Sequence, residues 1–112
     1  MGNIAELRVA LLFARWGYSI FFPLGSPTAD FIATQGNEVN TVQVKKATWQ
    51  EREKCFAVKL DMKKYASSMP KTFAFVSDNG VYLIDSSLIK NRRALRLGPK
   101  YPEFYDYLHQ LW

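Results

Sequence analysis

Two neighbouring stretches decide how this 112-residue chain folds: Ala29-Asp30-Phe31-Ile32-Ala33-Thr34 and Val39-Asn40-Thr41-Val42-Gln43-Val44-Lys45-Lys46-Ala47. Both are rich in β-branched and apolar residues, and Gln35-Gly36-Asn37 between them is typical of a tight turn, so they predict a β-hairpin. Alternation along the second strand places its polar and apolar side chains on opposite faces, with Thr41, Gln43 and Lys45 against Val42 and Val44. The apolar face meets the core, and the polar face is therefore turned towards something else.

Before the hairpin, the periodicity predicts a helix over Asn3 to Trp16. Ile4, Leu7, Leu11 and Ala14 fall on one apolar stripe at helical spacing. Asn3 is suited to the N-cap and Gly17 to the C-terminal stop. A short strand is predicted over 18–22, followed by a loop over 23–27, because two prolines and a glycine interrupt any ladder there.

After the hairpin, the sequence predicts a polar loop over 49–54 and a strand over 56–60. A short helix is predicted over 61–69, capped by Asp61 and stopped by Pro70. The remaining elements are a hairpin over 71–84 with a turn at 78–80, a helical turn over 86–91, an edge strand over 92–97 and a last helix. That helix is opened by Pro102 and carries Phe104, Leu108, Leu111 and Trp112 on one side. This order predicts a single α/β domain over 1–112, with a central mixed sheet flanked by helices.

The composition limits the class of protein. Hydrophobic residues make up 48% of the chain, enough for one core. The single cysteine, Cys55, excludes an internal disulfide, and the single histidine, His109, excludes a multi-histidine zinc site in one chain. No apolar run approaches the ~18 residues of a membrane span, and the N-terminus lacks the pattern of a secretion signal. We therefore expect a cytoplasmic protein with no membrane partner.

The charge is positive and unevenly distributed. Fifteen lysines and arginines against ten acids give a formal charge of +5. Most of the basic residues lie between Lys45 and Lys100, whereas the rest of the chain is net acidic. A basic middle segment beside a few isolated carboxylates favours a polyanionic partner, although a solvated surface is the alternative.

Four polar residues stand out from apolar surroundings: Glu6, Asp30, Gln43 and Lys45. Asp30 and the Gln43/Lys45 pair come from the two strands of one hairpin, so they can converge. Hydrolysis of a phosphodiester needs a metal ion to offset charge and activate water, and oxygen ligands suit Mg²⁺. Asp30 offers a carboxylate, Gln43 an amide oxygen, Glu6 a second carboxylate, and Lys45 a cation for the attacking water or the developing charge.

These residues lie in a pattern that resembles the PD-(D/E)XK nuclease superfamily. The pattern runs Gly-x-x-x-Glu at Gly2–Glu6, Gly17-Tyr18, Pro-x-x-x-x-x-Ala-Asp-Phe-Ile from Pro23, and Val42-Gln43-Val44-Lys45. Glutamine at position 43 is similar to the branch that contains a bacterial group I intron homing endonuclease. The segments Phe73–Ile84 and Leu95–Pro99 also resemble that branch. Archaeal Holliday-junction resolvases are a second likeness, although they carry glutamate where Gln43 stands.

The resemblance implies a restriction-endonuclease-like core and a metal-dependent DNA endonuclease. Asp30 and Gln43, with help from Glu6, would bind Mg²⁺, for which Mn²⁺ would substitute, and Lys45 would act on the nucleophilic water. The DNA would be duplex or branched. Cutting both strands needs two sites, so we expect a homodimer or a dimer of dimers. The basic residues expected to contact DNA are Lys46, Lys54, Lys63, Lys64, Arg92, Arg93 and Arg96.

Other interpretations of the same residues stay open. Glu6 has the spacing of a capping box with Asn3, Asp30 suits a turn, and Gln43 and Lys45 suit a solvated strand. For the whole chain, a sequence-reading homing or restriction-like enzyme competes with a structure-specific Holliday junction resolvase. A third possibility is a catalytically inactive DNA-binding module, because a neutral glutamine leaves one negative charge fewer to hold a cation.

Overall fold

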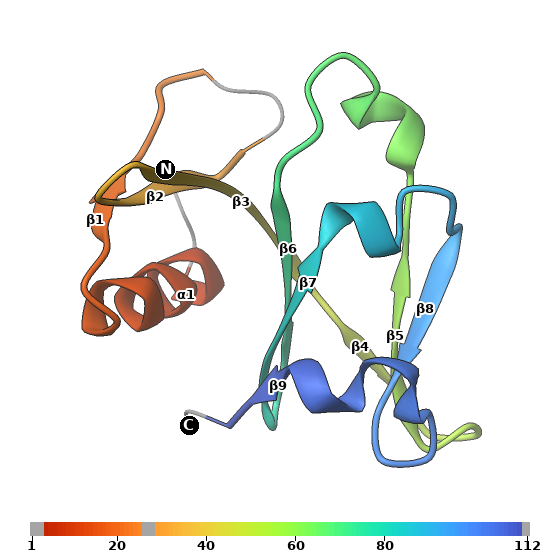
Figure 1. Ribbon diagram of the computed structural model, residues 1–112. Helices are drawn as coiled ribbons and strands as arrows, with labels where there is room; N and C mark the ends of the chain where they lie inside the picture. Colours follow the sequence, from red (N-terminus) through yellow and green to blue (C-terminus); the bar gives the residue numbers. More distant parts are fainter. Residues whose placement is uncertain (1–3, 26–28, 111–112) are drawn as a thin grey trace.

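The computed structural model describes residues 4–25 and 29–110 (Figure 1). A helix, α1 (Ile4–Arg15), precedes the strands β1 (Ser19–Phe21), β2 (Phe31–Gln35), β3 (Glu38–Lys46), β4 (Thr48–Gln50) and β5 (Cys55–Lys59). The chain continues through the 3₁₀ turn η1 (Met62–Tyr65) and the strands β6 (Thr72–Ser77) and β7 (Gly80–Asp85). It ends with η2 (Ser86–Leu88), β8 (Ala94–Leu97), η3 (Pro102–Tyr107) and β9 (Leu108–His109).

The strands form two sheets in the described part of the chain. The larger sheet is mixed, with the order β1-β2-β3-β6-β7-β9, and the smaller one has the order β4-β5-β8. In the larger sheet β3 and β6 run parallel to each other, and every other pair of neighbouring strands is antiparallel. β3 runs almost directly into β4, so one long stretch of chain links the two sheets, as Figure 1 shows. The prediction of an α/β fold with a central mixed sheet is confirmed.

The predicted hairpin forms between β2 and β3. Phe31 of β2 lies opposite Val42 of β3, and Gln35 lies opposite Glu38 across the turn. In the parallel pair, Gln43 lies beside Phe73 and Lys45 beside Phe75. Gln43 and Lys45 therefore lie on the same side of the sheet as Phe73 and Phe75 of β6.

Each face of the larger sheet has its own core. On one face, α1 packs on β2 and β3, and its Val9 and Phe13 join Phe31 and Val42. On the other face, the apolar side of the small sheet and η1 close over β6 and β7, and this cluster includes the fully buried Tyr65. By strand alternation Gln43 and Lys45 point to this second face. Helix α1 therefore covers the face opposite to these two side chains.

Helix α1 turns a different side to the core than its stripe indicates. The helix buries Val9, Ala10, Leu12 and Phe13, whereas the stripe is exposed, with Ile4 at 70% and Leu11 at 53%. An apolar stripe ordinarily faces the core, but this helix is apolar on two sides. The ring of Phe13 decides between them, because it packs edge-on against Tyr18 and Phe31.

The helix ends where the sequence predicts. Gly17 adopts a left-handed conformation with φ 93°, and the N–H of Tyr18 donates to the carbonyl of Phe13 at 3.1 Å. This closing bond satisfies a terminal carbonyl of the helix, and a side chain at position 17 would be strained. The predicted N-cap, Asn3, lies outside the described residues, as does part of the loop predicted over 23–27.

Three local predictions were wrong. Trp49 and Gln50, expected to begin a loop over 49–54, belong to β4, because their backbone pairs with β5. The helix expected over 61–69 is only the short η1, and Asp61 makes no capping hydrogen bond with its side chain. The last helix is the 3₁₀ segment η3, after which Leu108 leaves to pair with Tyr82 of β7.

Other predictions about single residues are settled by burial. Cys55 is fully buried, as expected, and its burial raises the pKa of the thiol. Phe104 packs into the core, whereas Leu111 and Trp112 lie outside the described residues. In the described part of the chain, no helix has the length and apolar character needed to cross a bilayer.

Candidate active site

Asp30 is held where the β2–β3 hairpin opens. It directly precedes β2, and its backbone N–H donates to the carbonyl of Val42 at 2.8 Å. Its carboxylate oxygen Oδ2 accepts two further bonds from β3, from the amide Nε2 of Gln43 at 3.0 Å and from the N–H of Val44 at 2.8 Å. Three contacts with the neighbouring strand therefore fix the position of this half-buried carboxylate.

Lys45 lies two residues beyond Gln43, on the same face of β3. Its side chain is half-buried, and its Nζ lies 5.8 Å from the centre of the Tyr65 ring. The structure thus brings Asp30, Gln43 and Lys45 onto one face at the border between the two sheets. A hydrogen bond joins Asp30 to Gln43, and Lys45 shares their face because alternate residues of a strand point to the same side.

Glu6 comes from a different side of the sheet. It is half-buried in the first turn of α1, the helix that covers the face opposite Gln43 and Lys45. Its role at the site therefore stays a prediction.

The donor set suits a hard cation that is bound together with substrate. Among the described residues, no group of three or more histidines, cysteines, aspartates or glutamates is placed to hold a metal ion. What the face offers is the carboxylate of Asp30 and the amide of Gln43, whose Nε2 now faces that carboxylate. Rotation of the Gln43 amide by half a turn would direct its oxygen, in place of Nε2, towards the side where the Asp30 carboxylate lies. Mg²⁺ accepts one or two protein oxygens when waters and phosphate oxygens complete its shell, so these residues fit it.

A groove of about 1150 Å³ begins at Lys45 and runs across the exposed face of the small sheet. Its walls combine apolar residues with basic and other polar side chains. The basic residues are Lys45, Lys46, Lys59, Arg92 and Arg96, and the acids are Glu53 and Glu103. Three of the predicted DNA-contacting residues, Lys46, Arg92 and Arg96, therefore line the same groove as Lys45.

Two arginines of the groove are engaged by carboxylates. Arg96 donates to Glu53 at 2.6 Å, and Arg92 donates to Glu103 at 2.8 Å. The hydrogen bond from Arg96 is the main reason that the pKa of Glu53 lies below its usual value. Such exposed pairs contribute little to stability, so a phosphate can take the place of the carboxylate at modest cost.

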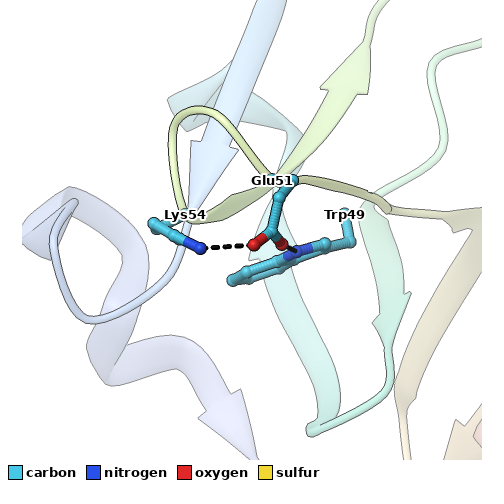
Figure 2. A network of polar contacts seen from close by, with 3 residues as sticks. All are labelled: Trp49, Glu51 and Lys54. Atoms are coloured by element: carbon cyan, nitrogen blue, oxygen red, sulfur yellow. Dashed lines mark hydrogen bonds and ion pairs between the residues drawn. The ribbon is translucent and has the colours of Figure 1, made fainter.

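The other predicted DNA contacts lie away from the groove. Lys54 forms an ion pair with Glu51 at the tip of the β4–β5 hairpin, and Glu51 also accepts a bond from the indole N–H of Trp49 at 2.6 Å (Figure 2). These two bonds lower the pKa of Glu51, that from Lys54 most. Lys63, Lys64 and Arg93 are exposed, with the first two on η1.

Sequence reasoning missed two residues of this region. Lys59 lines the groove from the end of β5, and Tyr65 lies under Lys45. The exposed position of Lys59 follows from strand alternation, so the sequence carried a signal for it. Tyr65 gave a weaker signal, an aromatic residue directly after two lysines.

The fold and these residues together define the protein as having a nuclease-like α/β fold of the restriction-endonuclease type. A bacterial homing endonuclease, I-Ssp6803I, has a similar structure, with a TM-score of 0.80 and 16% identity over 96% of this chain and 84% of that one. Hjc, a Holliday junction resolvase from the archaeal hyperthermophile Archaeoglobus fulgidus, matches with a TM-score of 0.60 and 12% identity, over 88% of this chain and 84% of that one. No protein-family model and no curated protein matches the sequence.

Proposed function

We propose that this protein is a metal-dependent DNA endonuclease that hydrolyses phosphodiester bonds inside the cell. The observation that carries the proposal is the shared face of Asp30, Gln43 and Lys45, together with a groove that Lys45 lines with four other basic side chains. The likeness in fold to a homing endonuclease and to a junction resolvase supports the same chemistry.

Each residue of the face has a distinct role in this reaction. Asp30 and Gln43 would hold Mg²⁺, or Mn²⁺ in its place, and Glu6 would assist either the metal or the structure from α1. When bound, the ion supplies charge compensation and an activated water. Lys45 places its ammonium beside the scissile phosphate, where it stabilises the negative charge that builds in the transition state. Because only one carboxylate is fixed on this face, these residues would hold a cation weakly in the absence of DNA phosphate.

The groove accounts for substrate binding. Lys46, Lys59, Arg92 and Arg96 follow the sugar–phosphate backbone away from the cut, and the two arginines exchange their carboxylates for phosphates. Contacts of this kind position the substrate without reading its sequence. Affinity should therefore fall steeply with salt concentration.

We place a duplex-reading homing or restriction-like activity first, because the structural likeness to the homing endonuclease is the larger of the two. Resolution of Holliday junctions is the second candidate, supported by the likeness to the archaeal resolvase. One chain carries one such site. A cut through both strands therefore requires two copies, and we propose a homodimer or a dimer of dimers as the active form.

A cleavage assay tests the proposal. Supercoiled plasmid, linear duplex, single strand and a four-way junction are incubated with Mg²⁺ or Mn²⁺. Lys45→Ala and Asp30→Asn should abolish cleavage while leaving DNA binding in place, and Lys90→Ala, an exposed lysine after η2, is the matched control. Discrete cuts in duplex support the first activity, and symmetric junction cuts support the second. Binding without cleavage on every substrate would make the protein an inactive DNA-binding module.

A further inference from the structure

Tyr65 lies directly behind the candidate active site although none of its surface reaches solvent. Its ring packs edge-on against Phe73, with the ring centres 5.3 Å apart, and Phe73 is the register neighbour of Gln43. Two ammonium groups lie over the same ring, Lys45 Nζ at 5.8 Å and Lys64 Nζ at 5.2 Å from its centre. This buried ring thus joins η1, β6 and the active face of β3.

The hydroxyl of Tyr65 does not explain its position. It is buried, and it has no hydrogen-bond partner among the described residues. The contacts that Tyr65 makes are therefore those of its ring: an edge-on contact with Phe73 and two ammonium groups, of Lys45 and Lys64, at 5.8 Å and 5.2 Å from its centre.

An aromatic ring can restrain a lysine that would otherwise move freely. The lysine side chain has a flexible four-carbon stem, so its ammonium does not stay in one place without a partner. The face of an aromatic ring attracts a cation within about 6 Å of its centre. A fully buried ring also keeps its own position, because the surrounding core is close-packed.

We propose that Tyr65 is a positioning residue for Lys45, and that its ring holds the ammonium of Lys45 where the scissile phosphate docks. The proposal rests on the proposed function, since it assigns Tyr65 a part in the same reaction. The ring, and not the hydroxyl, performs this role.

Lys64 uses the same ring from the exposed side of η1. Its ammonium lies 5.2 Å from the ring centre, and Lys64 does not line the groove. Lys64 contributes to the binding of the DNA backbone, so its removal should raise KM and leave kcat unchanged. Loss of the Tyr65 ring should do the reverse, because Lys45 acts in the chemical step.

Single-turnover cleavage by Tyr65→Phe and Tyr65→Leu tests the proposal. Tyr65→Phe should keep the wild-type rate within about twofold, and Tyr65→Leu should lose about tenfold in kcat with little change in KM. The loss should vanish in a Lys45→Ala background if any residual rate is measurable there, because the two residues act as one unit. Tyr82→Leu is the matched control, since Tyr82 is buried in the same cluster at 1% exposure. It should lose stability and keep kcat below its melting temperature.

A second measurement does not depend on cleavage. In the NMR spectrum of protein labelled at lysine, the Tyr65 ring current should shift the Hε resonances of Lys45 upfield, and Lys45→Arg assigns them. The shift should persist in Tyr65→Phe. Its absence from the wild-type spectrum, or equal loss of kcat in Tyr65→Phe and Tyr65→Leu, overturns the proposal. Wild-type protein that shows the shift but cuts no substrate overturns the proposed function, while it still supports Tyr65 as the residue that holds Lys45.

Discussion

Asp30 and Gln43 are hydrogen-bonded across the mouth of the β2–β3 hairpin, with the Gln43 Nε2 donating to the Asp30 Oδ2 at 3.0 Å. A neutral amide can donate to a carboxylate, so the pair is satisfied without any cation between its members. Two carboxylates in the same positions would repel each other until an ion bridged them. The glutamine therefore makes this half of the site stable in the free protein, and under the proposed function ion binding would depend on substrate.

Gln43→Glu tests this account. The free variant should be less stable by about 1–2 kcal/mol, because a hydrogen bond to Asp30 is replaced by repulsion between like charges. Mg²⁺ or Ca²⁺ should then raise its melting temperature by more than it raises that of the wild type. Thermal unfolding with and without each ion measures both effects. Gln110→Glu, which adds the same charge at an exposed position on the other side of the fold, is the control. Equal responses of the wild type and Gln43→Glu to the ions would remove Gln43 from the metal site.

Arg96→Ala should weaken DNA binding and reduce its dependence on salt. The arginine lines the groove, and its loss would also leave Glu53 unpaired and repulsive towards phosphate. If Arg96 makes one phosphate contact, the slope of log K against log salt should fall in magnitude by about one. Fluorescence anisotropy over a salt series gives the slope. Arg52→Ala, an exposed arginine at the tip of the β4–β5 hairpin, should leave the slope unchanged, and an unchanged slope for Arg96→Ala would take this residue out of the interface.

Leu12→Ala and Leu11→Ala test which side of α1 faces the sheet. Leu12 is 2% exposed and belongs to the core, whereas Leu11 is 53% exposed. Removal of the buried side chain should lower the free energy of unfolding by about 2–5 kcal/mol, and removal of the exposed one by less than about 0.5 kcal/mol. Urea denaturation of the two variants makes the comparison. The opposite order would show that the helix turns its predicted stripe to the core.

His109 should make the free energy of unfolding depend on pH near and just below pH 6.5, above the range in which the carboxylates titrate. It is half-buried beside Trp16, and burial lowers its pKa from the ordinary value of 6.5. The unfolded chain therefore takes up this proton first as the pH falls, so the contribution to stability is complete above about pH 6.5 and is lost as the pH drops below it. Melting temperatures between pH 5 and pH 8 should show this decline in the wild type.

His109→Gln should flatten the profile over the same range. The carboxylates whose pKa is lowered by hydrogen bonds, Glu51, Glu53 and Asp85, start from ordinary values of 4.5 or 3.8, and so act at lower pH. A decline that is as steep in His109→Gln as in the wild type would assign it to other groups.

The sequence alone determined the hairpin and the face that carries the candidate chemistry. Alternation with period two placed Gln43 and Lys45 together, and it needed only the apolar residues of the same strand to do so. The predicted hairpin brought Asp30 of the first strand close to the Gln43/Lys45 pair of the second. The stop at Gly17 followed in the same way from local backbone preference. These predictions succeeded because each depends on neighbours in the chain.

The tertiary structure decided what local patterns left open. Helix α1 has apolar residues on two sides, and only the fit of Phe13 against Phe31 selects the buried one. Trp49 and Gln50 were predicted to lie in a loop, and they form part of β4 because they pair with β5. The groove and the ring of Tyr65 under Lys45 join residues far apart in the chain. Contacts of this kind arise when separate segments pack together, so no periodicity within one segment can specify them.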